Sequence, residues 1–236
     1  MCFTVSVNIV KEELGKRYSK EFLDPDKYRP SYYYHAFSLP FLPIVTTRSI
    51  RMMHWGLIPT WVTDIKQAGE IRRNTFNARS ESIMEKPAFS ESYASRRCIV
   101  PVTGFFEWQH HGSQKIPWYI YRPDNAIMSL GGIWNEWTDS GSNSVLRTFS
   151  IITTEANKRL AEIHNSARRM PLVLADKDVE KWLSEDEASA RELMHPAPEE
   201  DIAAHTIGSL IGSKKGDKNT PEIIKPHEYY ITGSLF

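Results

Sequence analysis

Residues 98–123 have the sequence CIVPVTGFFEWQHHGSQKIPWYIYRP, and this stretch decides the fold that we expect. An apolar run up to Gln109 is followed by a polar turn, HHGSQK, and then by a second apolar run, PWYIYRP. Two more strand-like runs, 127–137 and 145–153, are separated by another polar turn, DSGSNS. Short apolar runs joined by polar turns are typical of an antiparallel sheet.

The N-terminal half adds shorter elements around this sheet. Residues 3–9, FTVSVNI, alternate between apolar and polar side chains, which predicts a strand directly after Cys2. We expect a short helix over 10–20, several short strands within 31–58 and another short helix near 62–69.

The C-terminal part is predicted to be mainly helical. Helical patterns occur near 155–161, 176–184 and 186–194, and a polar loop near 213–221 precedes a short final strand. Nothing in residues 1–236 has the composition of a linker. We therefore expect one α+β domain, in which helices flank a mainly antiparallel sheet.

Composition limits the classes of function. The chain of 236 residues carries 29 basic and 29 acidic residues, so any contact with nucleic acid must come from local basic clusters. The candidate clusters are Arg72-Arg73, Arg79, Arg96-Arg97 and Arg168-Arg169. With only two cysteines, Cys2 and Cys98, we expect no disulfide framework and a reducing compartment.

Targeting and cofactor signals are not found in the sequence. No basic region precedes the short apolar stretch at the N-terminus, and no apolar run approaches the roughly 20 residues that cross a bilayer. The eight histidines lack the spacing of metal ligands, so we expect neither zinc nor another cofactor. We expect a monomer in the cytoplasm, associated with the nucleoid if the organism is bacterial.

Cys2 is the first candidate catalytic residue. Once Met1 is removed, its α-amine (ordinary pKa about 7.7–8) and its thiol (about 8.5) lie on adjacent carbons. An aldehyde condenses with the amine to an imine, which the thiol then closes into a five-membered thiazolidine ring. One cysteine is a weak signal, since a small residue packed at a strand start would look the same.

The segment NTFNARSES, residues 74–82, places Asn77 and Arg79 on one face if it is extended. An amide can hold a terminal amine, and a guanidinium can bind a phosphate through two hydrogen bonds. On spacing alone, a polar loop with a solvent-facing arginine is the more ordinary interpretation.

The motif GFFEW, residues 104–108, predicts a strand in which Phe105 and Glu107 point away from Phe106 and Trp108. A carboxylate among aromatic residues loses hydration, which raises its pKa and suits it to proton transfer near neutral pH. The same periodicity allows an edge-strand glutamate in solvent. Trp108 fits either a base-stacking surface or the core.

His164 lies at the boundary between a helical stretch and a strand-like run in IHNSARRMPLVL, residues 163–174. Element boundaries are where scaffolds present catalytic groups, and histidine suits acid–base work near neutral pH. A histidine that bridges a turn is the commoner alternative.

Together these pieces resemble the SRAP family, the SOS-response-associated peptidases, which are regarded as abasic-site-processing proteins. The resemblance runs from residue 1 to about 210. It rests on five motifs in order: Met1-Cys2, WGLIPTW at 55–61, NARSES at 77–82, GFFEW at 104–108 and HNSARRMP at 164–171. It implies an antiparallel sheet bent into a pseudo-barrel with flanking helices.

The resemblance also implies catalytic roles. Cys2 would form a thiazolidine crosslink with the ring-opened sugar of an abasic site in single-stranded DNA. Asn77 would orient Cys2, while Glu107 and His164 would transfer protons. Weak lyase activity by β-elimination is implied as well, as is removal of Met1 by the protein itself or by an aminopeptidase.

DNA contacts are implied for three further residues. Arg79 would hold a phosphate beside the lesion, and Trp55 and Trp108 would stack against flanking bases. Many relatives begin MCGR, whereas this chain has Phe3 and Thr4, so a basic residue that could contact DNA is absent there.

Two other functions remain open. A cysteine peptidase of the N-terminal-nucleophile type, acting on proteins, would use the same Cys2, Glu107 and His164. A module that binds single strands without covalent chemistry would leave the order of the motifs unexplained. The arginine at 79 and the tryptophans favour DNA over a protein substrate.

Overall fold

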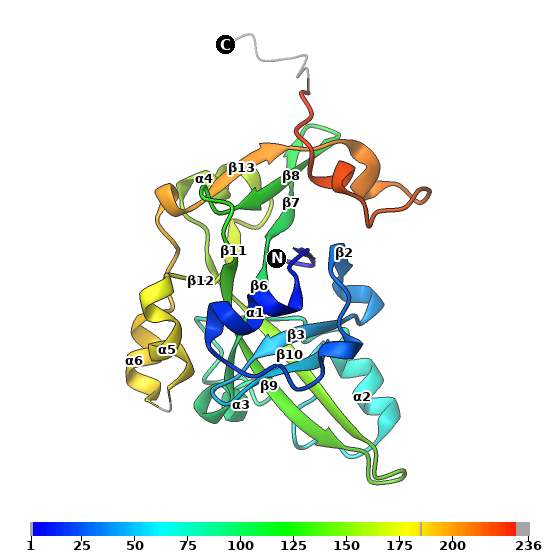
Figure 1. Ribbon diagram of the computed structural model, residues 1–236, viewed down its shortest axis with the longest axis vertical. Helices are drawn as coiled ribbons and strands as arrows, with labels where there is room; N and C mark the ends of the chain where they lie inside the picture. Colours follow the sequence, from blue (N-terminus) through cyan, green and yellow to red (C-terminus); the bar gives the residue numbers. More distant parts are fainter. Residues whose placement is uncertain (1, 185, 230–236) are drawn as a thin grey trace.

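Two β-sheets form the frame of the computed structural model, which describes residues 2–184 and 186–229 (Figure 1). The first sheet is antiparallel and has the strand order β13-β8-β7-β1-β2. Its strands are β1 (Thr4–Val7), β2 (Ser31–His35), β7 (Gly104–His111), β8 (Gln114–Tyr121) and β13 (Ala203–Thr206). Strand β7 is therefore internal, and β2 is an edge strand.

The second sheet has eight strands, five of which close into a barrel. They are β3 (Phe41–Val45), β4 (Ile50–Trp55), β5 (Asn77–Arg79), β6 (Arg97–Val102), β9 (Met128–Thr138), β10 (Val145–Glu155), β11 (Arg169–Pro171) and β12 (Val173–Leu174). The order β10-β4-β3-β6-β9 becomes a ring because β9 also pairs with β10. This ring confirms the predicted pseudo-barrel, although β10 runs parallel to β4 and β5.

The hairpin of β9 and β10 depends on glycine. A Cβ on Gly132 would lie 2.8 Å from the Ser150 carbonyl oxygen, and one on Gly131 would lie 2.6 Å from Leu172 Cδ2. Only a residue without a side chain allows the β9 and β10 backbones to approach this closely at Gly132, whereas Gly131 makes room for the Leu172 side chain. The predicted turn DSGSNS connects the two strands, with Asp139 Oδ2 accepting a hydrogen bond from the Ser142 amide.

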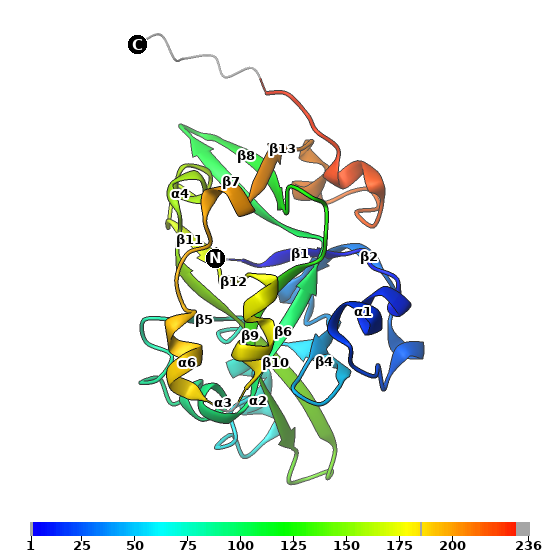
Figure 2. The same cartoon turned by 60° about the vertical axis from the view of Figure 1, so that its left-hand side comes forward.

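Helices cover the outside of the sheets (Figure 2). They are α1 (Lys11–Tyr18), α2 (Ile65–Arg72), α3 (Ser90–Ser95), α4 (Lys158–Ile163), α5 (Val179–Leu183) and α6 (Glu187–Glu192). Side-chain caps fix some of their starts: Asp64 accepts from the Gln67 amide and Asn157 from the Leu160 amide. All five predicted helices are present within a few residues, and α3 was not predicted. In the part of the chain that the structure describes, no helix is long and apolar enough to span a membrane.

Two segments differ from a simple meander. The stretch 98–109 divides at Thr103, so that β6 and β7 belong to different sheets. The Thr103 amide and hydroxyl both donate hydrogen bonds to Ser6, on β1. At the C-terminal end, residues 221–224 form a 3₁₀ turn where we expected the approach to a final strand, and residues 230–236 lie outside the described residues.

Gly104, at the start of β7, gives a test of this packing. A Cβ there would lie 2.5 Å from the Ile120 carbonyl oxygen and 2.5 Å from the Tyr119 ring. We predict that Gly104→Ala lowers the free energy of unfolding by about 1–3 kcal/mol. Gly69→Ala, on helix α2 with nothing within 4 Å, should instead raise it by about 0.4–1 kcal/mol. Urea unfolding measures both, and equal values for the two variants would contradict the close approach of β7 and β8.

Candidate active site

Cys2 lies directly before β1, and a barrel strand holds it from the other sheet. The Asn77 side chain, at the start of β5, donates a hydrogen bond from Nδ2 to the Cys2 carbonyl oxygen at 2.9 Å. Asn77 Oδ1 is buried and has no hydrogen-bond partner among the described residues. The amide thus fixes the backbone of Cys2 and leaves an acceptor beside it.

Glu107 and His164 form a second part of the same site. Strand β1 is antiparallel to β7, with Val5 opposite Phe105, so the chain that precedes β1 runs alongside Glu107. Glu107 is only 4% exposed, which excludes an edge-strand glutamate in solvent. His164 follows α4 and is 6% exposed, and its Nε2 lies 3.8 Å from Glu107 Oε2.

Burial sets the protonation of this pair. Loss of hydration raises the pKa of Glu107 to about 7 and lowers the pKa of His164. His164 Nδ1 lies 2.8 Å from the Arg169 carbonyl oxygen, so Nδ1 carries a proton and donates it there. In the neutral ring, Nε2 is then an acceptor directed at the Glu107 carboxyl group. The pair can accept or release a proton near pH 7.

The Cys2 thiol is fully buried, and this burial raises its pKa. The negative charge of Glu107 contributes a further increase. Near neutral pH the thiol is therefore protonated, in contrast to the low-pKa thiolates of reactive cysteines. Cys98 is also a free, buried cysteine, on β6.

Arg169 positions His164, a role that the sequence motifs alone did not predict. Its guanidinium is paired with the Glu81 carboxylate at 3.0 Å and donates to the Thr153 carbonyl oxygen at 2.6 Å. Because Glu81 and Thr153 both hold the Arg169 side chain, the Arg169 carbonyl group stays beside His164. The signal was present in the sequence, because Glu81 lies in NARSES and Arg169 in HNSARRMP.

In two of the candidate basic clusters, one of the two arginines is buried. Arg169 is engaged with Glu81, and Arg97 is 3% exposed and donates to the carbonyl oxygens of Trp182 and Tyr93. Neither guanidinium is available to DNA. Arg79 is exposed at the end of β5, two residues after Asn77.

The two tryptophans that were predicted to contact DNA differ in their exposure to solvent. Trp108 is half-buried on β7 and packs on a small apolar cluster with Phe106 and Tyr119. Trp55 is fully buried, donates from Nε1 to the Phe76 carbonyl oxygen and stacks on Phe149. The prediction that Trp55 stacks on a base is therefore wrong, because its ring is part of the barrel core.

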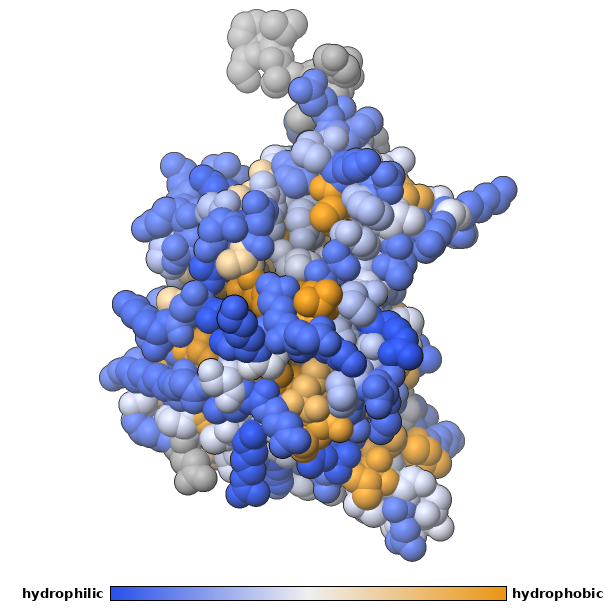
Figure 3. All heavy atoms as spheres, in the orientation of Figure 1, coloured by the Kyte–Doolittle hydropathy of each residue, from blue (hydrophilic) through white to orange (hydrophobic). Residues whose placement is uncertain are grey.

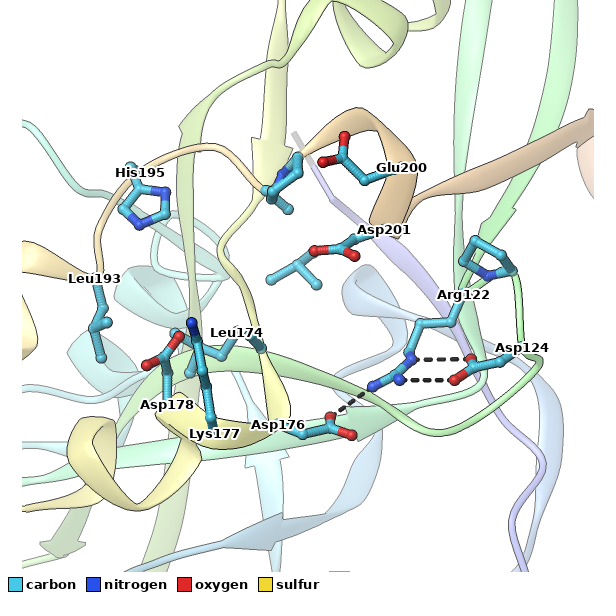
Figure 4. A pocket seen from close by; sticks show the side chains of 15 residues that line it. Arg122, Asp124, Leu174, Asp176, Lys177, Asp178, Leu193, His195, Glu200 and Asp201 are labelled. Atoms are coloured by element: carbon cyan, nitrogen blue, oxygen red, sulfur yellow. Dashed lines mark hydrogen bonds and ion pairs between the residues drawn. The ribbon is translucent and has the colours of Figure 1, made fainter.

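A separate surface hollow of about 730 Å³ does not suit DNA (Figure 4). Its charged lining is mainly acidic: Asp124, Asp176, Asp178, Glu200 and Asp201, against Arg122 and Lys177. Arg122 is itself bound by Asp124 and Asp176. These carboxylates would repel phosphates. Within the described residues, no group of histidine, cysteine and acidic side chains could hold a metal ion.

Comparison with known proteins places the chain in a family. Residues 1–214 match the family model described as SOS response associated peptidase (SRAP). The chain belongs to the SRAP family. It is 34% identical over 214 residues to "Abasic site processing protein YoqW" of Bacillus subtilis, covering 88% of this chain and 91% of that one. "Abasic site processing protein HMCES" of Gallus gallus is 30% identical, covering 92% of this chain and 72% of its own length.

A solved structure agrees with the fold of this SRAP protein. The crystal structure of a protein from Bacteroides thetaiotaomicron is 36% identical, with a TM-score of 0.91, and covers 96% of this chain and 100% of its own. Cys2, Asn77, Glu107 and His164 all lie within the residues that the family match covers.

We predict that Glu107→Gln changes how the stability of this SRAP protein depends on pH. The pKa of Glu107 is about 7 in the folded protein against an ordinary 4.5, so the folded state binds this proton more tightly. The free energy of unfolding therefore falls as pH rises from 4.5 to 7, by up to about 3 kcal/mol for this group alone.

Glutamine removes that dependence, so the variant should gain stability over wild type between pH 5 and pH 8. Urea unfolding at both pH values measures the difference. The lowered pKa of His164 acts in the opposite direction in both proteins and largely cancels in the comparison. Parallel pH curves would contradict the raised pKa.

Proposed function

We propose that this SRAP protein captures abasic sites in single-stranded DNA as a covalent thiazolidine at Cys2. Its relatives named as abasic site processing proteins support the substrate. The observation that carries the chemistry is the meeting of Asn77, Glu107 and His164 around Cys2. Removal of Met1 is a condition of the proposal, and Met1 lies outside the described residues.

In addition to the amine, the proposed reaction needs groups that transfer two protons: one to the departing hydroxide and one from the thiol to the ring nitrogen. The neutral α-amine adds to the sugar aldehyde, and the carbinolamine loses water to give an imine. Glu107, in its acid form, would give a proton to the departing hydroxide. The thiol then adds to the imine carbon, and its proton passes through Glu107 or His164 to the ring nitrogen. Overall, one water molecule is released.

The buried thiol supports an order of events in which the amine acts first. Because its pKa is raised by burial, the thiol stays protonated until a base removes its proton. A peptidase acting on other proteins needs an accessible, activated thiolate instead. The same imine would permit β-elimination at the sugar, which gives the weak lyase activity that we include in the proposal.

Arg79 would hold the phosphate next to the lesion. It is exposed, and β5 places it on the same side as Asn77, so a phosphate bound there lies beside Cys2. DNA as the substrate would place the protein in the compartment that contains DNA.

We predict that protein from which Met1 has been removed forms a denaturant-stable adduct with a single-stranded oligonucleotide carrying an abasic site. The Cys2→Ala variant should form none, because it keeps the amine but cannot close the ring. Denaturing gels detect the adduct, and intact mass confirms the loss of Met1 and the release of one water. Equal crosslinking by Cys2→Ala would refute the proposal.

A second prediction concerns the phosphate contact. Arg79→Ala should lower the affinity for single-stranded DNA and reduce the slope of log affinity against log salt by about 0.7, the contribution of one phosphate contact. Arg147→Ala removes the same charge from a side chain that is paired with Glu136, and should leave the slope unchanged. Equal slopes for the two variants would argue against the Arg79 contact.

A further inference from the structure

The chain continues beyond the SRAP match, and this C-terminal segment, residues 215–229, is a fixed part of the fold. Ile223 is buried in the cluster that contains Phe106. The Ile224 carbonyl oxygen lies 2.7 Å from His205 Nε2, and Pro226 bridges to Ile207. In Figure 1 the segment follows β13 and lies beside the upper end of β2.

The segment covers the open edge of β2 and brings a lysine to it. Asn219 Oδ1 accepts a hydrogen bond from the Tyr32 amide at 2.9 Å. Lys218 Nζ lies 4.9 Å from the centroid of the Tyr33 ring, within the range of a cation–π contact. No salt bridge joins Lys218 to a carboxylate in the described part of the chain. No acidic side chain among the described residues therefore neutralises its charge.

An aromatic row starts at this lysine. Tyr33 and His35 are on the same face of β2 and stack with an interplanar angle of 16° and centroids 6.1 Å apart. Phe37 follows 5.5 Å from His35, and this residue is 48% exposed. On the face of the molecule that Figure 3 presents, in the orientation of Figure 1, apolar residues lie at the surface among hydrophilic ones. A large aromatic side chain that is half exposed, in line with two others, is typical of a stacking surface.

The row ends at the candidate active site. The Phe37 ring lies 5.4 Å from Phe3 and 5.0 Å from Phe76. Phe3 directly follows Cys2, and Phe76 directly precedes Asn77. Ring contacts therefore run without a break from Phe3, next to Cys2, to Tyr33, which Lys218 of the C-terminal segment contacts.

We propose that Tyr33, His35, Phe37 and Lys218 form a track for the single strand on one side of the lesion. A base next to the lesion stacks on the half-exposed Phe37 ring, the strand then passes along the edges of His35 and Tyr33, and Lys218 holds a phosphate at the far end. A duplex cannot use this track, because its base faces are already stacked on one another. The proposal rests on the proposed function, since it assumes an abasic nucleotide at Cys2.

The test measures non-covalent affinity. A single-stranded oligonucleotide with a tetrahydrofuran analogue of the abasic site has no aldehyde, so binding is read without crosslinking. By fluorescence anisotropy, Lys218→Gln should lower the affinity about fivefold at low salt and reduce the salt slope by about 0.7. Lys225→Gln, which removes the same charge from a lysine paired with Glu222 in the same segment, should change neither.

A one-sided track makes a sharper prediction. Two oligonucleotides are compared, one with the analogue at its 5′ end and one with it at its 3′ end. Lys218→Gln should weaken the binding of only one of them, and Tyr33→Leu should weaken the binding of that same one. Equal losses on both, or none, would overturn the track. Urea unfolding checks that both variants are as stable as wild type, which excludes a loss of folding as the cause.

The two proposals fail separately. If wild type crosslinks an aldehyde-bearing abasic oligonucleotide but Lys218→Gln binds like wild type, the track is wrong and the proposed function stands. If the affinity changes appear but no Cys2-dependent adduct forms, the lesion chemistry is wrong.

Discussion

Strand β10 is the constraint on which the rest of the structure depends. Its first part pairs with β9, from Val145 opposite Thr138 to Ile151 opposite Gly132, and this pairing closes the barrel. Its second part pairs with β5 and β11, which carry Asn77 and Arg169. A slip of one residue in any of these pairings would turn the side chains of the slipped strand to the other face. The positions of Asn77 against Cys2 and of the Arg169 carbonyl against His164 thus follow from the registers of two strands that pair with β10.

The site lies where the two sheets meet, and this location explains its chemistry. Glu107 comes from an internal strand of the first sheet, whereas Asn77 comes from the barrel. Enclosure between them removes water from the carboxyl group and brings its pKa to about 7. The same enclosure keeps the Cys2 thiol protonated. A buried carboxyl group destabilises the fold at high pH, which is a cost commonly found at functional sites.

Charge is distributed locally in this protein. The net charge is zero, and the structure separates an acidic hollow around Asp176 from the exposed Arg79 and the half-buried Lys218. Two arginines that look available in the sequence serve the fold instead, since Arg97 and Arg169 donate hydrogen bonds to buried carbonyl groups. A polyanion would therefore be guided by a few side chains around the site and not by an overall field.

The sequence by itself determined the local patterns. The alternation in GFFEW fixed which side of β7 Glu107 takes, and the order of the five motifs pointed to the SRAP family. Only the tertiary structure decided which residues cover each face of a strand. It placed Trp55 in the core, paired Glu81 with Arg169, divided 98–109 between two sheets and laid the C-terminal segment on β2. The reason is physical: periodicity reports the direction of a side chain along its own strand, whereas burial and pairing depend on residues far away in the sequence.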